Sequence, residues 1–529
     1  MQKKKLQVWL PILFSLVMIA GMFIGYRIKE NMPGKSMFFM DKRKPVEEVI
    51  DLVKNKYVDE VNIDSLTSEA VSSMLAKLDP HSIFMPASEL QQVTEELEGK
   101  FYGIGIEFNI IEDTINVINV IQGGPSDKAG IKMGDKIIKA ADTTVAGVKI
   151  SSDKIRNLLK GSAGSKVNIS ILRENESKQF TIVREAIPIF SLDAAYMLTS
   201  NIGYIRLNKF AETTYVEFMT AAEKLQKQGM QHIILDLRDN GGGVLNEATE
   251  MADEFLDDNK MITYTEGLHS PRKEYKCKRN GIFEKGKVIV LVNEYTASAS
   301  EVLAGALQDW DRATILGRRT FGKGLVQEQF ELSDGSGLRL TVARYYTPLG
   351  RSIQKSYSNG TTAYLEELHN RIKEGELVSF DSIKHGHGKK FTTASGKVLY
   401  GEGAITPDVF VSADTTAFNK ELTNLYIKGT LSVFAYRNYL SHKSTFSTYK
   451  TPAEFEKNYT IDDPTWESFK LAAAKDSVSL NNITSKEKDD LIRQLKRLTA
   501  RQLWRTEGYY EVTNAQDAMV LKALDELRK

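Results

Sequence analysis

A serine at position 298 lies in a local sequence that could make it a nucleophile. The apolar run 288–292 reads as a buried strand, a short turn rich in small residues follows it, and a helical stretch runs from Val302 to Asp309. This order places Ser298 at or just before a helix N-terminus, where free NH groups and the helix dipole favour developing negative charge. Serine is also a usual N-cap residue. By itself, the run is explained better by capping than by catalysis.

A lysine in a second segment, 320–327, could supply the base that such a nucleophile needs. Burial in an apolar site lowers the pKa of a lysine toward neutrality, so that its amine can accept a proton. Glycines flank Lys323, and Phe321 and Leu325 could help to exclude water. If the following chain is extended, Lys323 and Gln327 point to one face, and the Gln327 amide could hold the amine. For this segment read alone, an exposed lysine in a glycine turn is the commoner case.

The same stretch, starting at Gly317, matches the first part of a phosphate-binding P-loop. Two features argue against a nucleotide site. Gly324 stands where the motif needs the Ser or Thr that binds Mg²⁺. Residues 325–332 read as a strand, whereas a phosphate cradle requires a helix there.

Three consecutive glycines end a third candidate segment, 235–243, which begins as a hydrophobic strand. Glycines let a backbone NH approach a substrate oxygen closely, so Gly241 or Gly242 could belong to an oxyanion hole. A plain glycine turn is the alternative. His232 and Asp236 lie four residues apart on this strand and suggest a Ser-His-Asp triad, but a histidine among Ile and Leu is more often a packed, hydrogen-bonded one.

The composition narrows the chemistry further. Of 529 residues, 70 are Lys or Arg and 69 are Asp or Glu, so the net charge of +1 gives no electrostatic case for binding nucleic acid. The seven histidines are scattered and the single cysteine, Cys277, has no second thiol, so we expect no metal site and no disulfide. We interpret Cys277 as an incidental surface residue. Catalysis is therefore expected from Ser, Lys, Asp and Glu.

An uncharged run from Leu6 to Tyr26 follows three lysines at positions 3–5. It is long enough to cross a hydrocarbon core of about 30 Å as a helix. A cleavable signal peptide would need a shorter apolar core and an A-x-A-like site, so a signal anchor is favoured over a cleaved signal. The basic N-terminus would stay in the cytoplasm and the remaining chain would face the outside.

The elements that must position these residues follow from the patterning of the rest of the chain. In chain order, the pattern is helical at 44–97, β-rich at 101–185 with one helix near Ser152–Leu159, alternating strand and helix at 202–411, and helical again beyond 414, with a capping box at 484–487. A charged stretch at 361–390 interrupts the α/β part, and we interpret it as a surface insertion. Its His385 and His387 are interpreted as part of a solvated loop, since no acidic or Cys partner is near.

Together, these segments resemble the carboxyl-terminal processing peptidases, a family of serine endopeptidases with a Ser/Lys catalytic pair. The resemblance runs from residue 78 to residue 408. It implies that Ser298 is the nucleophile, Lys323 the general base and Gln327 the residue that orients the base, with no metal or cofactor. Thr296 stands where the family commonly has serine, but it precedes the nucleophile. Ser300 is a rival nucleophile by chemistry alone, and only the family motif assigns the role to Ser298.

The oxyanion of such a mechanism would be met by the NH of Ala299 and, as a hypothesis, by one of Gly241 and Gly242. The resemblance also implies that the β-rich region is a PDZ module. Residues 101–106 look like its carboxylate-binding loop, in which consecutive NH groups capture a peptide C-terminus and the following strand edge pairs with the peptide. The substrate-binding residues would be Gly103, Ile104, Gly105 and Ile106.

The expected fold is multidomain α/β, with a crotonase-like α/β protease core and a β-rich PDZ domain. The predicted parts are a membrane anchor (1–30), a helical N-terminal region (36–98), the PDZ domain (99–186), the peptidase core (187–413, with an insertion at about 358–392) and a helical C-terminal region (414–529). The expected location is the bacterial inner membrane, with a single span and the catalytic domains in the periplasm. Partners would be protein substrates with free C-terminal tails. The C-terminal helices could form a homodimer or cover the active site, and the sequence does not choose between these. An adaptor protein is a further candidate partner.

Two other functions stay open at this point. A membrane-anchored PDZ scaffold without catalysis would share the anchor and the PDZ module. A crotonase-like acyl-CoA enzyme would share the α/β core, although the anchor and the PDZ module argue against it.

Overall fold

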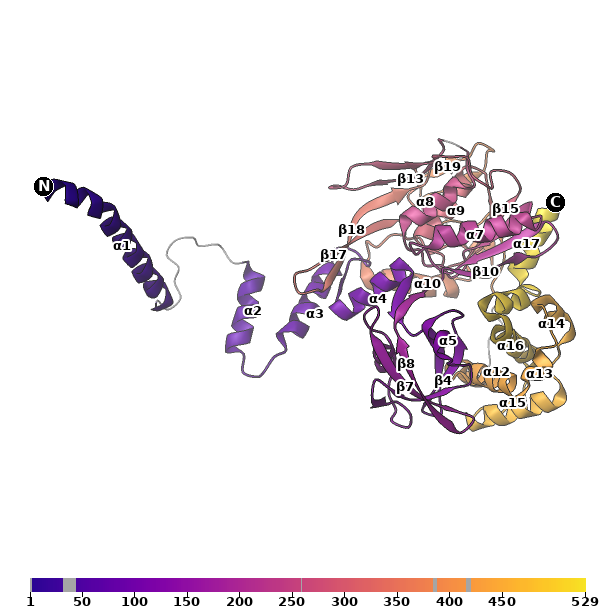
Figure 1. The fold of residues 1–529 in the computed structure, drawn as a ribbon. Helices are drawn as coiled ribbons and strands as arrows, with labels where there is room; N and C mark the ends of the chain where they lie inside the picture. The colour runs from indigo at the N-terminus through magenta and orange to yellow at the C-terminus, as the bar shows by residue number, and fades with distance from the viewer. Residues whose placement is uncertain (1, 32–43, 258, 384–387, 415–419) are drawn as a thin grey trace. The chain divides into compact units, whose positions relative to one another are not determined.

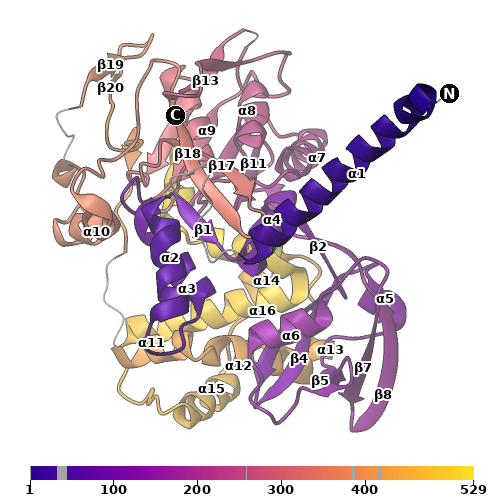
Figure 2. The same ribbon diagram turned by 90° about the vertical axis from the view of Figure 1, so that its left-hand side faces the viewer.

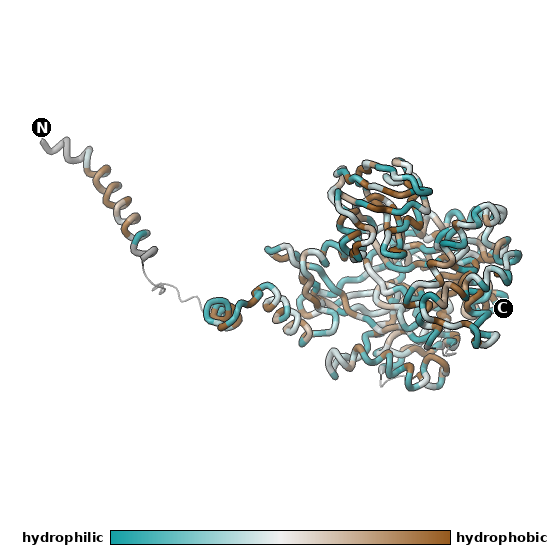
Figure 3. The backbone as a smooth tube through the Cα atoms, turned by 90° about the horizontal axis from the view of Figure 1, so that it is seen from below, coloured by the Kyte–Doolittle hydropathy of each residue, from teal (hydrophilic) through white to brown (hydrophobic). Residues whose placement is uncertain are grey.

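The structure is a computed structural model that describes residues 2–31, 44–257, 259–383, 388–414 and 420–529 (Figure 1). The chain forms two compact units, Met1–Ser73 and Met74–Lys529, which are described separately. In the first unit, α1 (Gln2–Asn31) contains a stretch, Trp9–Arg27, that is long and apolar enough to cross a membrane. This stretch is the brown part of α1 in Figure 3. The predicted N-terminal apolar helix is confirmed as a helix.

The region predicted to be helical contains α2 (Pro45–Lys56), α3 (Ile63–Leu75) and α4 (Ala87–Glu98). The prediction is wrong at β1 (Ile83–Met85), which pairs antiparallel with β18. Local periodicity misses this strand because its partner comes more than two hundred residues later in the chain. The strand fixes the segment 79–85 beside the sheet that carries the candidate base.

The β-rich region holds a six-stranded antiparallel sheet in the order β3-β4-β5-β7-β8, with β6 paired to β5. Its core contains Ile115, Val117, Ile137 and Ile169, and Ile155 of the predicted helix α6 (Ser152–Leu159) packs into it. Among the described residues, β3 pairs only with β4, so its other edge is open. The remaining bounds are β2 (Lys100–Gly103), β3 (Ile106–Ile111), β4 (Thr114–Val120), α5 (Pro125–Ala129), β5 (Lys136–Ala140), β6 (Thr143–Thr144), β7 (Lys166–Arg173), β8 (Glu176–Val183) and β9 (Glu185–Pro188), which pairs with β2.

The central sheet of the α/β part has the order β10-β11-β12-β15-β16-β21, and all pairs except β10·β11 are parallel. Parallel strands with both faces covered read as continuous apolar runs, and β15 (Val288–Val292), predicted from such a run, is buried at every residue. Helices α7, α8 and α9 lie together on one face (Figure 1). The bounds are β10 (Leu192–Met197), β11 (Ile202–Leu207), α7 (Thr214–Lys227), β12 (His232–Asp236), α8 (Leu245–Asp253), α9 (Ala299–Asp309), β16 (Thr314–Gly317) and β21 (Val409–Phe410).

A second sheet, in the order β1-β18-β13-β14 with β17 paired to β18, carries the candidate base at one end. The predicted strand after residue 324 is confirmed as β17 (Leu325–Glu331). Its neighbours are β13 (Met261–Glu266), β14 (Lys273–Lys276) and β18 (Gly337–Tyr346), and a separate hairpin is formed by β19 (Lys390–Thr392) and β20 (Val398–Tyr400).

The stretch interpreted as a surface insertion begins with α10 (Gly360–Lys373), which is largely exposed but packs one side against the core. Tyr364 and Arg371 are buried. The Arg371 guanidinium donates to the carbonyls of Arg319 and Thr320 at 2.7 and 2.9 Å, so α10 supports the segment that leads to Lys323. The many charged residues of α10 had indicated a fully solvated segment. The sequence alone does not show that Arg371 donates to these carbonyls. A short 3₁₀ turn follows at Phe380–Ser382, and the paired histidines at 385 and 387 lie outside the described residues.

The single cysteine also corrects a prediction. Cys277 is buried in the main core rather than at the surface. Burial, with the nearby Asp253 carboxylate, raises the pKa of its thiol to about 12. It is therefore an apolar packing residue, and its lysine neighbours in the sequence do not activate it.

The C-terminal helices pack beside the β-rich region and against the central sheet (Figures 1 and 2). The Tyr436 hydroxyl donates to the Val117 carbonyl at 3.1 Å, and Arg505 forms an ion pair with Glu107 of β3 at 2.7 Å. The predicted capping box is confirmed at the start of α16, where Thr484 and Glu487 bond each other's backbone amides. The helices are α11 (Lys420–Ile427), α12 (Thr430–Ser441), α13 (Lys443–Phe446), α14 (Pro452–Asn458), α15 (Asp463–Lys475), α16 (Ser485–Asn514) and α17 (Ala518–Arg528).

Candidate active site

Ser298 occupies the sharp turn between β15 and α9. Its backbone has φ 56° and ψ −118°, a region that non-glycine residues rarely adopt and that costs about 1–3 kcal/mol. Neighbouring hydrogen bonds maintain this conformation: the Ala297 amide donates to the Asn240 carbonyl at 3.0 Å, and the Phe321 amide donates to the Thr296 carbonyl at 2.9 Å. Strained backbone at a serine between a strand and a helix is the geometry of a nucleophile that must stand clear of its surroundings.

The residues predicted for catalysis and for the oxyanion hole meet in one cavity of about 560 Å³. Its lining includes Ser298 and Lys323, which come from different loops. It also contains apolar side chains from α4, α8, α9 and β17, which can keep water away from the reacting groups. The lining also includes Gly241, Gly242, Ala299, Gln327, Arg339 and Tyr345.

The Lys323 amine is oriented by hydrogen bonds from the second sheet. It donates to the Gln327 Oε1 atom at 2.9 Å, and the Gln327 Nε2 atom donates to the His81 carbonyl. Burial lowers the pKa of Lys323 to about 8, and the positive charge of Arg339 contributes. A pKa of about 8 leaves roughly a tenth of this lysine neutral at pH 7, far more than for an exposed lysine, and this neutral form can accept a proton.

A buried carboxylate, Glu301, connects the two loops. Its Oε2 atom accepts the amides of Ser298 at 2.9 Å and Lys323 at 2.8 Å. Its Oε1 atom accepts the Gly322 amide at 2.8 Å and the Thr320 hydroxyl at 2.5 Å. Burial raises the pKa of Glu301 to about 7, although these four donors favour the charged form. Glu301 was not among the residues predicted for the site, but the Ser-x-x-Glu spacing of a capping box is a local signal that could have suggested it.

Tyr345 is a second residue that the sequence analysis missed. Its buried hydroxyl lies 3.1 Å from the Ser298 carbonyl and also contacts the Lys323 carbonyl. It thus fixes the same two loops from the side of β18. The sequence carries no local signal for this role, because Tyr345 lies in an ordinary strand pattern.

The residues predicted for the oxyanion hole differ in whether their backbone NH groups already have a hydrogen-bond acceptor. Ala299 is the first residue of α9, where a helix leaves its NH groups without an intrahelical acceptor. The Gly242 amide donates to Asn240 Oδ1 at 2.9 Å, whereas Gly241 is exposed at the cavity. Gly242 packs so closely on the serine turn that a Cβ atom there would lie 2.7 Å from the Cβ of Ser298.

The other residues that the sequence raised for catalysis make different contacts in the structure. The Ser300 hydroxyl is buried and donates to the Asn240 carbonyl at 3.0 Å, and the Thr296 hydroxyl donates to the Leu237 carbonyl at 2.8 Å, so both support the turn. His232 accepts the Lys287 amide through Nδ1 at 3.1 Å. Within the described ranges, His, Cys, Asp and Glu side chains form no group of three that could hold a metal ion.

Comparison with known proteins gives three matching family models. Residues 201–363 match peptidase family S41, residues 103–183 match the PDZ domain, and residues 422–505 match a family of unknown function. The chain is 32% identical over 348 residues to the carboxy-terminal-processing protease of Bartonella bacilliformis, covering 65% of this chain and 79% of that protein. It is 36% identical over 313 residues to a probable CtpA-like serine protease of Staphylococcus epidermidis, covering 59% of this chain and 63% of that protein.

Among solved structures, the photosystem II D1 C-terminal processing protease is 29% identical, with a TM-score of 0.36, covering 70% of this chain and 87% of that one. The matches define a serine peptidase core combined with a PDZ domain. The chain belongs to peptidase family S41, and its resemblance to the carboxyl-terminal processing peptidases is confirmed.

We predict that Gly242→Ala lowers peptidase activity by at least about 100-fold, because a Cβ atom at φ 93° would displace the Ser298 turn. The matched control is Gly241→Ala, whose added Cβ meets no atom within 4 Å and leaves the amide in place. Hydrolysis of a fluorogenic peptide by the two variants gives the measurement. Equal activity of both variants would contradict the predicted contact.

We also predict that kcat/KM rises from pH 6 to pH 9, with its midpoint near pH 8, because Lys323 must be neutral to act as a base. Protonation of Glu301 below about pH 7 adds to the loss in acid. Arg339→Gln removes a charge that lowers the Lys323 pKa, so the midpoint should move to higher pH. Arg344→Gln, at an exposed position on the same strand, is the control and should leave the midpoint in place. A flat profile over this range would rule out Lys323 as the base.

Proposed function

We propose that this protein is a membrane-anchored serine endopeptidase that binds the C-terminal tail of an extracytoplasmic protein through its PDZ domain and cleaves peptide bonds through a Ser298/Lys323 pair. The observation that carries the proposal is the shared cavity. It brings a strained serine at a helix N-terminus together with a buried lysine whose pKa is lowered to about 8. A non-catalytic scaffold would have no need of either feature.

The proposed reaction is acyl transfer to water. Neutral Lys323 takes the Ser298 proton as the serine oxygen attacks the peptide carbonyl carbon. The NH groups of Ala299 and Gly241 stabilise the oxyanion, since the Gly242 amide is already bound to Asn240. Lys323 then protonates the leaving amine. Water, deprotonated by Lys323, attacks the acyl-enzyme, releases the new carboxylate and regenerates the serine.

Tail recognition is proposed for the loop 101–106 and the open edge of β3. The loop is held from one side, because the Ile104 and Gly105 carbonyls accept the amides of Ser126 and Ile121, each at 3.0 Å. Gly105 has φ 72°, which turns the chain into β3. A peptide that adds to this edge as a strand would place its terminal carboxylate at the NH groups of residues 103–106.

The location and the domain limits are also proposals. The helix α1 would anchor the chain in the bacterial inner membrane, with the parts 36–98, 99–186, 187–413 and 414–529 in the periplasm. The uncharged Trp9–Tyr26 stretch and the basic residues before it support this orientation.

We predict that Ser298→Ala and Lys323→Ala each lower peptide hydrolysis by at least about 1000-fold while the circular dichroism spectrum stays unchanged, because each removes a reacting group. Lys285→Ala, at an exposed lysine, is the control and should keep full activity. The test uses the full-length chain in detergent. Unchanged hydrolysis in Ser298→Ala would favour the scaffold function or another nucleophile.

A second prediction concerns the substrate tail. A protein substrate with a free C-terminal carboxylate should be cleaved at least about tenfold faster than the same substrate with an amidated C-terminus, because amidation removes the charge that the NH groups bind. Cleavage of the two forms is followed by mass spectrometry at substrate concentrations below KM. Equal rates would exclude carboxylate capture without affecting the assignment of the Ser/Lys pair.

A further inference from the structure

The last helix of the chain, α17, covers the face of the central sheet that α7, α8 and α9 leave open. Met519, Val520, Ala523 and Leu527 pack in one apolar cluster with residues of β11, β12, β15 and β16. Figure 1 shows α17, in yellow, beside β15. Because parallel strands need apolar cover on both faces, the C-terminal segment is part of the catalytic core rather than an appendage to it.

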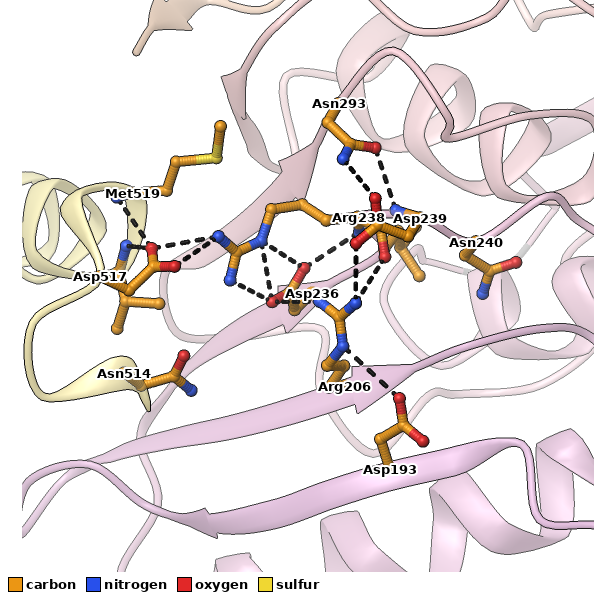
Figure 4. Close-up of polar contacts among 12 residues, drawn as sticks. Asp193, Arg206, Asp236, Arg238, Asp239, Asn240, Asn293, Asn514, Asp517 and Met519 are labelled. Carbon is orange, nitrogen blue, oxygen red and sulfur yellow. Dashed lines mark hydrogen bonds and ion pairs between the residues drawn. The ribbon is translucent and has the colours of Figure 1, made fainter. Parts of the chain in front are cut away.

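Asp517, the N-cap residue of α17, makes two kinds of contact. Its Oδ1 atom accepts the amides of Met519 and Val520 at 2.9 and 3.0 Å, which caps the helix. Its two carboxylate oxygens, Oδ1 and Oδ2, also accept hydrogen bonds from the Nη1 atom of Arg238, at 3.0 and 2.9 Å. Figure 4 shows the Arg238 side chain between Asp517 and Asp236. The second contact links Asp517, near the C-terminus, to Arg238, which lies just after the end of β12 at Asp236.

Arg238 belongs to a largely buried charge cluster. It donates through Nε and Nη2 to Asp236, with distances of 2.6–3.0 Å, and Asp236 is fully buried. Asp236 also accepts the Tyr204 hydroxyl at 2.6 Å and pairs with Arg206 at 2.9 Å. Although burial acts to raise it, Arg238 and Arg206 hold the pKa of Asp236 below its ordinary value. Buried charges are costly unless they are paired, so the loss of Asp517 would leave Arg238 with one carboxylate instead of two.

The loop after Arg238 leads directly to the active site. The Arg238 carbonyl accepts Arg206 Nη2 at 3.0 Å, and Asp239, at φ 62°, exchanges hydrogen bonds of 2.8 and 3.0 Å with the side chain of Asn293. The next residue, Asn240, accepts the Gly242 amide on its side chain, and its carbonyl accepts the Ala297 amide and the Ser300 hydroxyl. Only Asp239 therefore separates Arg238, which binds Asp517, from Asn240, which holds both the glycine loop and the serine turn.

We propose that Asp517 is a positioning residue for catalysis: by holding Arg238, it fixes the loop 239–242 against the Ser298 turn, so that the Gly241 amide stays directed at the oxyanion. The inference rests on the proposed function. It gives the end of the chain a role in the chemical step, although Asp517 touches neither the substrate nor Ser298.

The test compares Asp517→Asn, Arg238→Gln and the double variant in the full-length chain in detergent. Asparagine is as good an N-cap as aspartate, so Asp517→Asn keeps the cap and removes the charge that holds Arg238. We expect kcat to fall by about tenfold or more with KM within about twofold, because only the transition-state oxyanion loses a well-placed donor. Labelling of Ser298 by a small fluorophosphonate, which needs no tail binding, should slow by a similar factor.

In the Arg238→Gln background, Asp517→Asn should have no further effect on kcat, because the two residues act as one unit. Asp525→Asn, at an exposed position on the same helix, is the control and should behave as the unmodified chain. If Asp517→Asn does not fold, Asp517→Ser retains a capping hydroxyl and replaces it in the same measurements.

Three outcomes would overturn the inference. The first is a fall in thermal stability with kcat and labelling unchanged below the melting temperature, which would make Asp517 a structural cap. The second is an additive loss of kcat in the double variant. The third is a rise in KM alone. Ser298→Ala separates this from failure of the proposed function: if Ser298→Ala is inactive and Asp517→Asn is fully active, only the role of Asp517 is wrong.

Discussion

The geometry of the proposed Ser298/Lys323 pair depends on one buried carboxylate. Glu301 has no solvent to stabilise its charge, so it must be satisfied by protein donors, and the four donors it finds lie on the two loops that carry Ser298 and Lys323. Separation of the loops would take away the Thr320, Gly322 and Lys323 donors and leave that carboxylate only the Ser298 amide, which is costly in a dry interior. The same interaction therefore supports the strained serine and sets where the lysine loop begins.

In the proposed mechanism, removal of water is what lets a lysine act where a histidine is more usual. An exposed lysine is protonated at neutral pH, but burial among apolar side chains, with Arg339 nearby, brings the Lys323 pKa to about 8. The Gln327 Oε1 atom accepts a hydrogen bond from the amine, and the Gln327 Nε2 atom donates to the His81 carbonyl, in a segment that β1 ties to the second sheet. Desolvation and orientation thus come from elements that are far apart in the sequence.

Much of the fold was predictable because it obeys local rules. The continuous apolar run 288–292, the amphipathic helix Ser152–Leu159 and the capping box at Thr484 all occur where the pattern indicated them. The failures have one cause, the dependence on distant partners. β1 is a strand only because β18 lies beside it, Arg371 is buried only because the carbonyls of Arg319 and Thr320 need donors, and Cys277 is buried because the main core closes over it.

The sequence by itself determined the types of the candidate reacting groups and their order along the chain: a serine after a buried strand, a lysine between glycines before an extended segment, and a glycine turn after another strand. Periodicity, glycine chemistry and capping preferences are local properties, so they can be read without coordinates. Only the tertiary structure decided which groups hold them. Glu301, Tyr345, Asn240 and Asp517 act through backbone amides, carbonyls and guanidinium groups that come together when the sheets close, and no local pattern specifies such contacts.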